Sequence, residues 1–150
     1  MILLVSSSGG CFDSLLQLRS FWSQHERLWI TPRTPMAEEA LAGERVAWSF
    51  SPTIRNIPNL LRNLRLALRL LLRERPTLVL STGAGVAVPF LVLGRLLGAR
   101  TVFIESVTRV TSLSLSARLV RPFLTVLYVH WAQLQRRYPQ AELIVGAWQP

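Results

Sequence analysis

The stretch VSSSGGCFDSLLQL, from Val5 to Leu18, joins an apolar run to an apolar helical pattern through a cluster of small residues. The run that leads into it, Ile2–Val5, has the length and composition of a buried strand. Gly9 and Gly10 allow the backbone to turn sharply and to approach a ligand closely, because they carry no Cβ atom. A strand that passes through such a turn into a helix is the repeating unit of α/β folds.

The rest of the chain repeats this alternation of short apolar runs and helical patterns. Further strands are predicted at Leu28–Thr31, Val46–Phe50, Leu78–Ser81, Thr101–Ile104, Val126–Val129 and Leu143–Val145. Helices are predicted at Ser14–Ser23, Met36–Leu41, Ile57–Arg73 and Val86–Leu97. Unbroken runs of valine, isoleucine and leucine between helices are typical of parallel strands buried on both faces. The sequence therefore predicts a doubly wound, mostly parallel α/β sheet of the Rossmann-like class, formed as a single domain over residues 1–150.

The charge of the chain is strongly positive and is carried by arginine alone. All 17 basic residues are arginine, and they outnumber 8 acidic residues to give a net charge of +9. Biased codon use is one explanation for the missing lysine, and a partner of opposite charge explains the excess. An anionic lipid surface or a phosphorylated substrate suits arginine. Nucleic acid is not expected, because the aromatic residues are not interleaved with the arginines and no nucleic-acid motif is recognised.

Two features of the sequence bear on its location. Residues Met1–Val5 lack the basic region and long apolar core of a signal peptide, and the single Cys11 permits no internal disulfide. A cytoplasmic location is therefore expected. The uncharged run Pro76–Gly94 is 19 residues long, close to the roughly 20 residues of a membrane span. Because glycine and proline interrupt it, a strand, a turn and a helix are predicted there instead of a transmembrane helix.

Two turns of small residues follow predicted strands, and both are candidates for binding an anion. The turns beyond the carboxyl ends of parallel strands meet at one edge of the sheet, where ligands bind. The first turn leads into a helix, whose N-terminus supplies N–H groups. Neither turn matches the dinucleotide fingerprint or the P-loop, so a plain strand-to-helix turn is the alternative. The residues of the two turns are Ser8, Gly9 and Gly10, and Thr82, Gly83, Ala84 and Gly85.

A few side chains near these turns are candidates for chemistry. Glu105 follows a predicted strand and is a candidate general base, or alternatively a helix cap or a partner of Arg109. Cys11 is expected to fill the turn, since no cysteine–histidine arrangement supports a nucleophile. His25 and His130 are expected to be structural, and no bound metal is expected, because neither histidine has the spacing of a metal ligand.

The helix predicted at Ile57–Arg73 carries a row of arginines. They are three or four residues apart and so share one face, with leucines on the other faces. The arginines are Arg62, Arg65, Arg69 and Arg73. A basic amphipathic helix of this kind suits a negatively charged membrane surface. The alternative is the solvated face of an ordinary helix that covers a sheet.

Several short motifs along nearly the whole chain resemble one family. They are Ser7-Ser8-Gly9-Gly10, Arg55-Asn56-Ile57, Ser81–Pro89, Ile104-Glu105-Ser106, Arg109-Val110, Leu113-Ser114-Leu115, and Trp131 with Tyr138-Pro139. Together they are similar to the accessory subunit of two-part glycosyltransferases, represented in bacteria by the PssD- and CpsF-type proteins of capsule and exopolysaccharide synthesis. The eukaryotic counterpart is the membrane-recruiting subunit of the transferase that adds the second N-acetylglucosamine to dolichyl-diphosphate-N-acetylglucosamine.

This resemblance implies a fold like the N-terminal half of MurG, which is the acceptor-binding half of a GT-B glycosyltransferase. It implies a subunit that binds a polyprenyl-diphosphate-linked sugar at the inner face of the cell membrane. The UDP-sugar donor is expected on a separate catalytic chain, so that transfer of a hexose needs both chains. No cofactor is expected on this chain itself.

The resemblance also implies roles for individual residues. The acceptor and its diphosphate are expected to contact Ser8, Gly9, Gly10, Cys11, Thr82, Gly83, Ala84, Gly85, Ser106 and Arg109. The family pattern Ser-Gly-Gly-His has Cys11 at its histidine position, so Glu105 is the expected proton acceptor.

Two alternatives to this function differ in strength. The change at Cys11 leaves open a non-catalytic scaffold that only recruits a catalytic partner to the membrane. A nucleotide-binding oxidoreductase is disfavoured, because the fingerprint is missing and Arg33 stands where an acid that binds NAD is expected.

Overall fold

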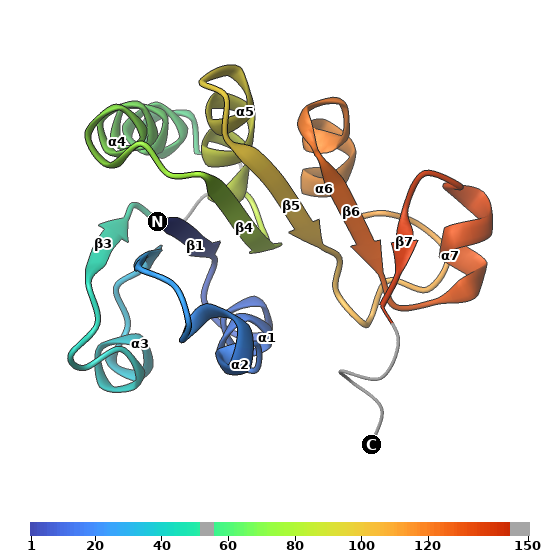
Figure 1. Ribbon diagram of the computed structural model, residues 1–150, viewed down its shortest axis with the longest axis horizontal. Helices are drawn as coiled ribbons and strands as arrows, with labels where there is room; N and C mark the ends of the chain where they lie inside the picture. The colour runs from blue at the N-terminus through green and yellow to red at the C-terminus, as the bar shows by residue number, and fades with distance from the viewer. Residues whose placement is uncertain (52–55, 145–150) are drawn as a thin grey trace.

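Parallel strands form the centre of the molecule, as the computed structural model shows for the residues that it describes, 1–51 and 56–144 (Figure 1). The strands are β1 (Ile2–Ser6), β2 (Arg27–Pro32), β3 (Val46–Ser49), β4 (Leu78–Gly83), β5 (Arg100–Ile104), β6 (Val126–Val129) and β7 (Glu142–Leu143). They form one seven-stranded sheet in the order β3-β2-β1-β4-β5-β6-β7, and every neighbouring pair is parallel. The prediction of a doubly wound, Rossmann-like α/β sheet is confirmed.

Helices cover both faces of this sheet. They are α1 (Gly10–Leu16), α2 (Arg19–Trp22), α3 (Pro35–Ala40), α4 (Ile57–Glu74), α5 (Ala87–Leu96), α6 (Leu115–Val120), the 3₁₀ helix η1 (Arg121–Phe123) and α7 (Ala132–Arg137). Figure 1 shows α4, α5 and α6 on one face, α1, α2 and α3 on the other, and α7 beside β7. The chain order returns from β3 to the centre of the sheet through α4, which places β1 and β4 side by side.

The two faces of the sheet have separate apolar cores, and β1 contributes to both. Leu3 and Val5 pack with the leucines of α4 and with α5, whereas Ile2 and Leu4 pack with α1, Trp22 and Trp29. Successive side chains of a strand point to opposite faces, so an entirely apolar strand is required where both faces are buried. This burial is the reason why the run at Ile2–Val5 could be recognised as a central strand.

The structure differs from the predicted elements in three places. The single helix predicted at Ser14–Ser23 is two short helices, α1 and α2, and the indole N–H of Trp22 donates a hydrogen bond (3.0 Å) to the Leu15 carbonyl across the break. The short helices α6 and α7 were not predicted, since six residues are too few to give a clear apolar period. The last strand begins at Glu142, one residue before its predicted start, and Val145 lies outside the described residues.

The uncharged run Pro76–Gly94 folds as predicted. It contains β4, the turn after it and most of α5, whose first turn holds Pro89. Among the residues that the structure describes, no helix combines the length and the apolar character needed to cross a membrane.

Candidate functional site

The turn after β1 is open to solvent and ends in a helix N-terminus. Gly9 has φ +81° and ψ −136°, a conformation that residues with a Cβ atom rarely adopt, so glycine is required there. Ser8, Gly9 and Gly10 are exposed, and no side chain caps α1. The first N–H groups of a helix have no partner within the helix. The turn therefore leaves backbone donors open to solvent at the start of α1, a helix of only seven residues, and anion binding there stays a prediction.

The turn after β4 lies directly against the first turn. The hydroxyl of Thr82 donates a hydrogen bond (2.5 Å) to the Cys11 carbonyl, and the Ser7 N–H donates one (2.8 Å) to the Gly83 carbonyl. Gly83 has φ +114°, and a Cβ atom placed there would lie 3.2 Å from the Cys11 Sγ atom. The two turns thus form one bonded unit, with Ala84 exposed at its rim.

The third segment at this edge is the loop after β5, which begins with Glu105. Glu105 is only 3% exposed, and its carboxylate accepts hydrogen bonds from the N–H of Ser106 (2.9 Å) and from the N–H (2.8 Å) and hydroxyl (3.0 Å) of Ser114. Ser114 in turn caps α6, because its hydroxyl oxygen accepts the Ala117 N–H. The partners of Glu105 are therefore the two serines and not Arg109, whose side chain is exposed.

Trp131, which belongs to the resembling motifs and precedes α7, and Arg137 of α7 hold the same loop. The Trp131 indole N–H donates a hydrogen bond (2.6 Å) to the Val107 carbonyl, and the Arg137 guanidinium donates one (2.9 Å) to the Thr111 carbonyl. Glu105, Trp131 and Arg137 thus hold the loop at three separate points. Hydrogen bonds of this kind restrict the conformations of an exposed loop and so reduce the entropy lost when it binds a ligand.

A small cavity of about 20 Å³ lies where these segments meet, and we refer to it as the edge cavity. Its lining residues are Gly10, Cys11, Ser14, Thr82, Ile104, Glu105, Ser106 and His130. The volume is enough for about one water molecule. Five of the predicted site residues therefore come together there, and Ser8, Gly9, Gly83, Ala84, Gly85 and Arg109 lie outside the lining.

His130, which the sequence predicted to be structural, lines the edge cavity, as do Ser14 and Ile104, which were not among the predicted site residues. His130 directly follows β6, so it stands at the carboxyl edge of the sheet together with the residues after β1, β4 and β5. Burial lowers the pKa of the His130 imidazole below its usual value of 6.5, and this effect outweighs a hydrogen bond to the main chain of Glu105 and the negative charge of Glu105. The sequence alone could have placed His130 at this edge, because a polar residue immediately after a buried parallel strand lies at the carboxyl edge of the sheet.

The outward side of α4 carries both leucines and arginines. Asn63 anchors the helix from its inner side, where its amide exchanges two hydrogen bonds with the main chain of Phe50. The residues that we name the α4 outer surface are Leu61, Leu64, Leu68, Leu72, Arg65 and Arg69, and all six are exposed. Leucines do lie on faces other than the arginine row, but these four are 41–57% exposed and are not on the side of the helix that packs on the sheet. Leu71, by contrast, is buried.

The four predicted arginines of α4 are all exposed, but their contacts differ. Arg62 donates a hydrogen bond to the Asn59 side chain (2.9 Å), and Arg73 lies 3.4 Å from the Glu74 carboxylate. Within the part of the chain that the structure describes, Arg65 and Arg69 have no ion-pair partner. Both face solvent beside the row of exposed leucines.

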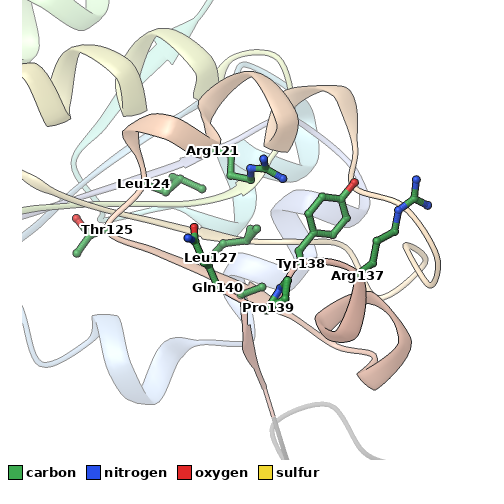
Figure 2. A pocket seen from close by; sticks show the side chains of 9 residues that line it. Arg121, Leu124, Thr125, Leu127, Arg137, Tyr138, Pro139 and Gln140 are labelled. Carbon is green, nitrogen blue, oxygen red and sulfur yellow. The ribbon is translucent and has the colours of Figure 1, made fainter.

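A much larger pocket, of about 470 Å³, lies at the opposite edge of the sheet, where β6 and β7 begin (Figure 2). Figure 2 shows the Tyr138 ring between Arg121 and Arg137, whose guanidinium carbons lie 5.2 and 5.8 Å from the ring centre. None of the predicted site residues lines this pocket. Size alone therefore does not locate the site, since the two bonded turns and the perturbed histidine are at the other edge.

No metal centre is found among residues 1–51 and 56–144, where no group of three or more histidine, cysteine, aspartate or glutamate side chains is close enough to hold an ion. The edge cavity offers backbone N–H groups, hydroxyls, a thiol and an imidazole. These groups can bind an anion or sugar hydroxyls and can accept a proton.

Comparison with known families connects this arrangement with oligosaccharide synthesis. A family model described as "Oligosaccharide biosynthesis protein Alg14 like" matches residues 46–147. The mouse (Mus musculus) UDP-N-acetylglucosamine transferase subunit ALG14 is 38% identical over 78 residues, which are 48% of this chain and 36% of the mouse protein. The Debaryomyces hansenii subunit of the same name is 32% identical over 106 residues, 67% of this chain and 44% of that protein. The matches thus span less than half the length of these relatives.

Solved structures show the same fold at low sequence identity. MurG from Acinetobacter baumannii superposes with a TM-score of 0.75 and 16% identity, over 96% of this chain and 44% of MurG. The UDP-GlcNAc 2-epimerase from Methanocaldococcus jannaschii gives a TM-score of 0.72 and 12% identity, over 96% of this chain and 44% of the epimerase. The predicted likeness to part of MurG is confirmed at the level of the fold.

Proposed function

The chain belongs to the family of Alg14-like oligosaccharide biosynthesis proteins, and from this premise we propose that it is one subunit of a two-chain UDP-sugar-dependent hexosyltransferase. In this proposal the chain binds a polyprenyl-diphosphate-linked sugar, and a catalytic partner chain binds the UDP-sugar. The transferase is active only when both chains are present. The bacterial PssD- and CpsF-type role in capsule and exopolysaccharide synthesis is the specific context that we propose.

The observation that carries this proposal is the bonding of the two glycine turns at one edge of the sheet. Exposed N–H groups at Gly9 and Gly10 suit the diphosphate, because a helix N-terminus attracts negative charge. Arg109 is exposed, and its main-chain N–H bonds to the carbonyl of Ser106, a lining residue of the edge cavity, so we place its guanidinium against a second phosphate oxygen. The acceptor sugar then lies over Cys11, Thr82 and Ser106.

The α4 outer surface is the proposed contact with an anionic membrane. Exposed leucines beside arginines allow a helix to lie in the interface, with its apolar side chains inserted and its cations near lipid phosphates. A peripheral position at the inner, cytoplasmic face of the cell membrane follows from this proposal. It brings the chain to the layer in which a polyprenyl-linked acceptor resides.

The test is co-expression with the candidate catalytic partner, purification through a tag on this chain, and an assay of UDP-N-acetylglucosamine consumption with a polyprenyl-diphosphate-linked sugar. We expect both chains to co-purify and to transfer the sugar together, with no transfer by either chain alone. Transfer by this chain alone would contradict the two-chain proposal. Failure to co-purify with any catalytic partner would contradict it as well.

A matched pair of arginine variants sharpens the site assignment. Arg109→Gln removes a guanidinium whose side chain is exposed, so the fold and partner binding should be retained. We expect KM for the lipid-linked acceptor to rise about tenfold, because a charge-assisted hydrogen bond to phosphate contributes roughly 1.5–3 kcal/mol. Arg118→Gln, at an exposed position of α6, is the control and should leave KM unchanged.

The second candidate function is a scaffold that recruits its partner without taking part in transfer. Two observations favour it: Cys11 provides no basic group, and the Glu105 carboxylate already accepts three hydrogen bonds. Under this reading Arg109→Gln and edge-cavity variants would leave kcat and KM of the two-chain complex unchanged. Substitutions on the α4 outer surface would still reduce activity on membranes.

A further inference from the structure

His130 shares the edge cavity with the groups that the proposed function uses. The cavity is bounded by the turn after β1, the turn after β4 and the loop after β5, and His130 supplies its fourth side from the end of β6. His130 therefore lies in the same cavity as Gly10 of the first turn and Thr82 of the second. A proton released by an acceptor hydroxyl at this site would pass to one of the ionisable groups of the cavity.

The other ionisable groups of the cavity are less suited. Cys11 carries a thiol, whose sulfur is only a weak hydrogen-bond acceptor and so a poor partner for a hydroxyl proton. The Glu105 carboxylate accepts hydrogen bonds from Ser106 and Ser114, so it holds the loop after β5 in place.

His130 has the opposite character. Desolvation disfavours the imidazolium, which keeps the ring neutral at pH 7, and a neutral imidazole is the side chain best matched to proton transfer near this pH. Its hydrogen bond to the main chain of Glu105 orients the ring and favours the imidazolium once a proton has arrived. Two other titratable groups line the cavity beside His130, namely Glu105 and Cys11. The negative charge of Glu105 raises the pKa of His130.

We propose that His130 is the proton acceptor of the two-chain transferase, a role that rests on the proposed function. The hydroxyl oxygen of the acceptor sugar attacks the anomeric carbon of the UDP-sugar, and the bond from that carbon to the UDP oxygen breaks. UDP leaves with the bonding electron pair. The hydroxyl proton moves to the His130 imidazole and is later released to water, so the products are the extended acceptor, UDP and one proton.

The chain contains two histidines, which provides a matched control. His130→Gln and His25→Gln are compared in the complex with the catalytic partner, His25 being exposed beside the Phe21 ring. We expect His130→Gln to lower kcat by about 10²–10⁴-fold with KM for the UDP-sugar unchanged, the usual contribution of general-base catalysis. His25→Gln should behave as the unsubstituted complex. Unchanged kcat in a folded His130→Gln complex would overturn the proposal.

The pH profile separates a proton acceptor from a merely structural histidine. Because burial lowers the pKa of His130 below its usual value of 6.5, the neutral base predominates at pH 7 and above, and kcat should fall as the pH drops through that lowered pKa. His130→Gln should abolish this acidic limb of the profile. An identical acidic limb in the variant would show that another group accepts the proton.

An NMR titration keeps the test independent of activity and of the folding of any variant. The ring proton signals of the two histidines of the isolated chain are followed against pH, with and without inorganic pyrophosphate as the probe. We expect pyrophosphate to raise the pKa of His130, because an anion nearby stabilises the imidazolium, and to leave His25 unchanged. An unaltered His130 titration at saturating probe would overturn its placement at the ligand. A shifted His130 in a complex without sugar transfer would contradict the proposed function and retain the placement.

Discussion

The edge cavity draws its lining from four segments that are far apart in the chain, whereas the α4 outer surface comes from one helix of 18 residues. The segments around the edge cavity are held together by side-chain hydrogen bonds, such as those from Thr82 to Cys11 and from Ser114 to Glu105. The leucines of the α4 outer surface are exposed and Arg65 faces solvent among them. The comparison indicates that one region is fixed by internal bonds, and that the other is available for an external partner.

This difference predicts opposite responses to substitution, and the largest effect is expected at the edge. Glu105→Ala leaves three donors of Ser106 and Ser114 without their acceptor in a buried position. We expect the free energy of unfolding to fall by about 3 kcal/mol, measured by urea denaturation, because unsatisfied buried donors are costly. Glu38→Ala is the control. It removes an exposed ion pair with Arg33 and should change stability by less than about 0.5 kcal/mol.

The second-largest effect is expected for the exposed leucines of α4. Their substitution should weaken binding to membranes and leave the free energy of unfolding nearly unchanged. Leu64→Ser with Leu68→Ser removes two apolar side chains that are 41% and 44% exposed. We expect binding to vesicles that contain anionic lipid to weaken by about 2 kcal/mol, roughly 30-fold, since each inserted side chain contributes about 1 kcal/mol. A large loss of thermal stability in place of this change would mean that the leucines belong to the core. Met36→Ser, at an exposed position of α3 on the other face, should bind as the unsubstituted chain.

The smallest effect is expected for a single arginine of the same surface. Arg69→Gln should weaken binding to anionic vesicles by about 1 kcal/mol, roughly fivefold, at low ionic strength. The difference should vanish at high salt, because exposed charges are screened over a few ångströms there. Arg136→Gln, an exposed arginine of α7, controls for net charge. An equal loss in both variants would indicate diffuse attraction to the positive chain in place of a defined surface.

The same comparison explains how far the sequence could be interpreted. The strands at Ile2, Leu78 and Thr101 were predictable, because runs of apolar residues that are buried on both faces have no polar alternation to confuse them. The two glycine turns were predictable as neighbours, since parallel strands place their carboxyl ends at one edge. The exposed leucines of α4 were not, because a sequence period shows that a helix has faces but not which of them meets the sheet.

The sequence by itself determined the α/β class, the parallel sheet and the family, because each of these depends on local periodicity and on motifs that are continuous in the chain. Only the tertiary structure decided that Glu105 bonds to Ser114 and not to Arg109, and that His130 joins Cys11 in one cavity. The physical reason is that these side chains come close to one another only after the sheet has formed. Residue 130 is more than one hundred positions from residue 11, and no local preference connects them.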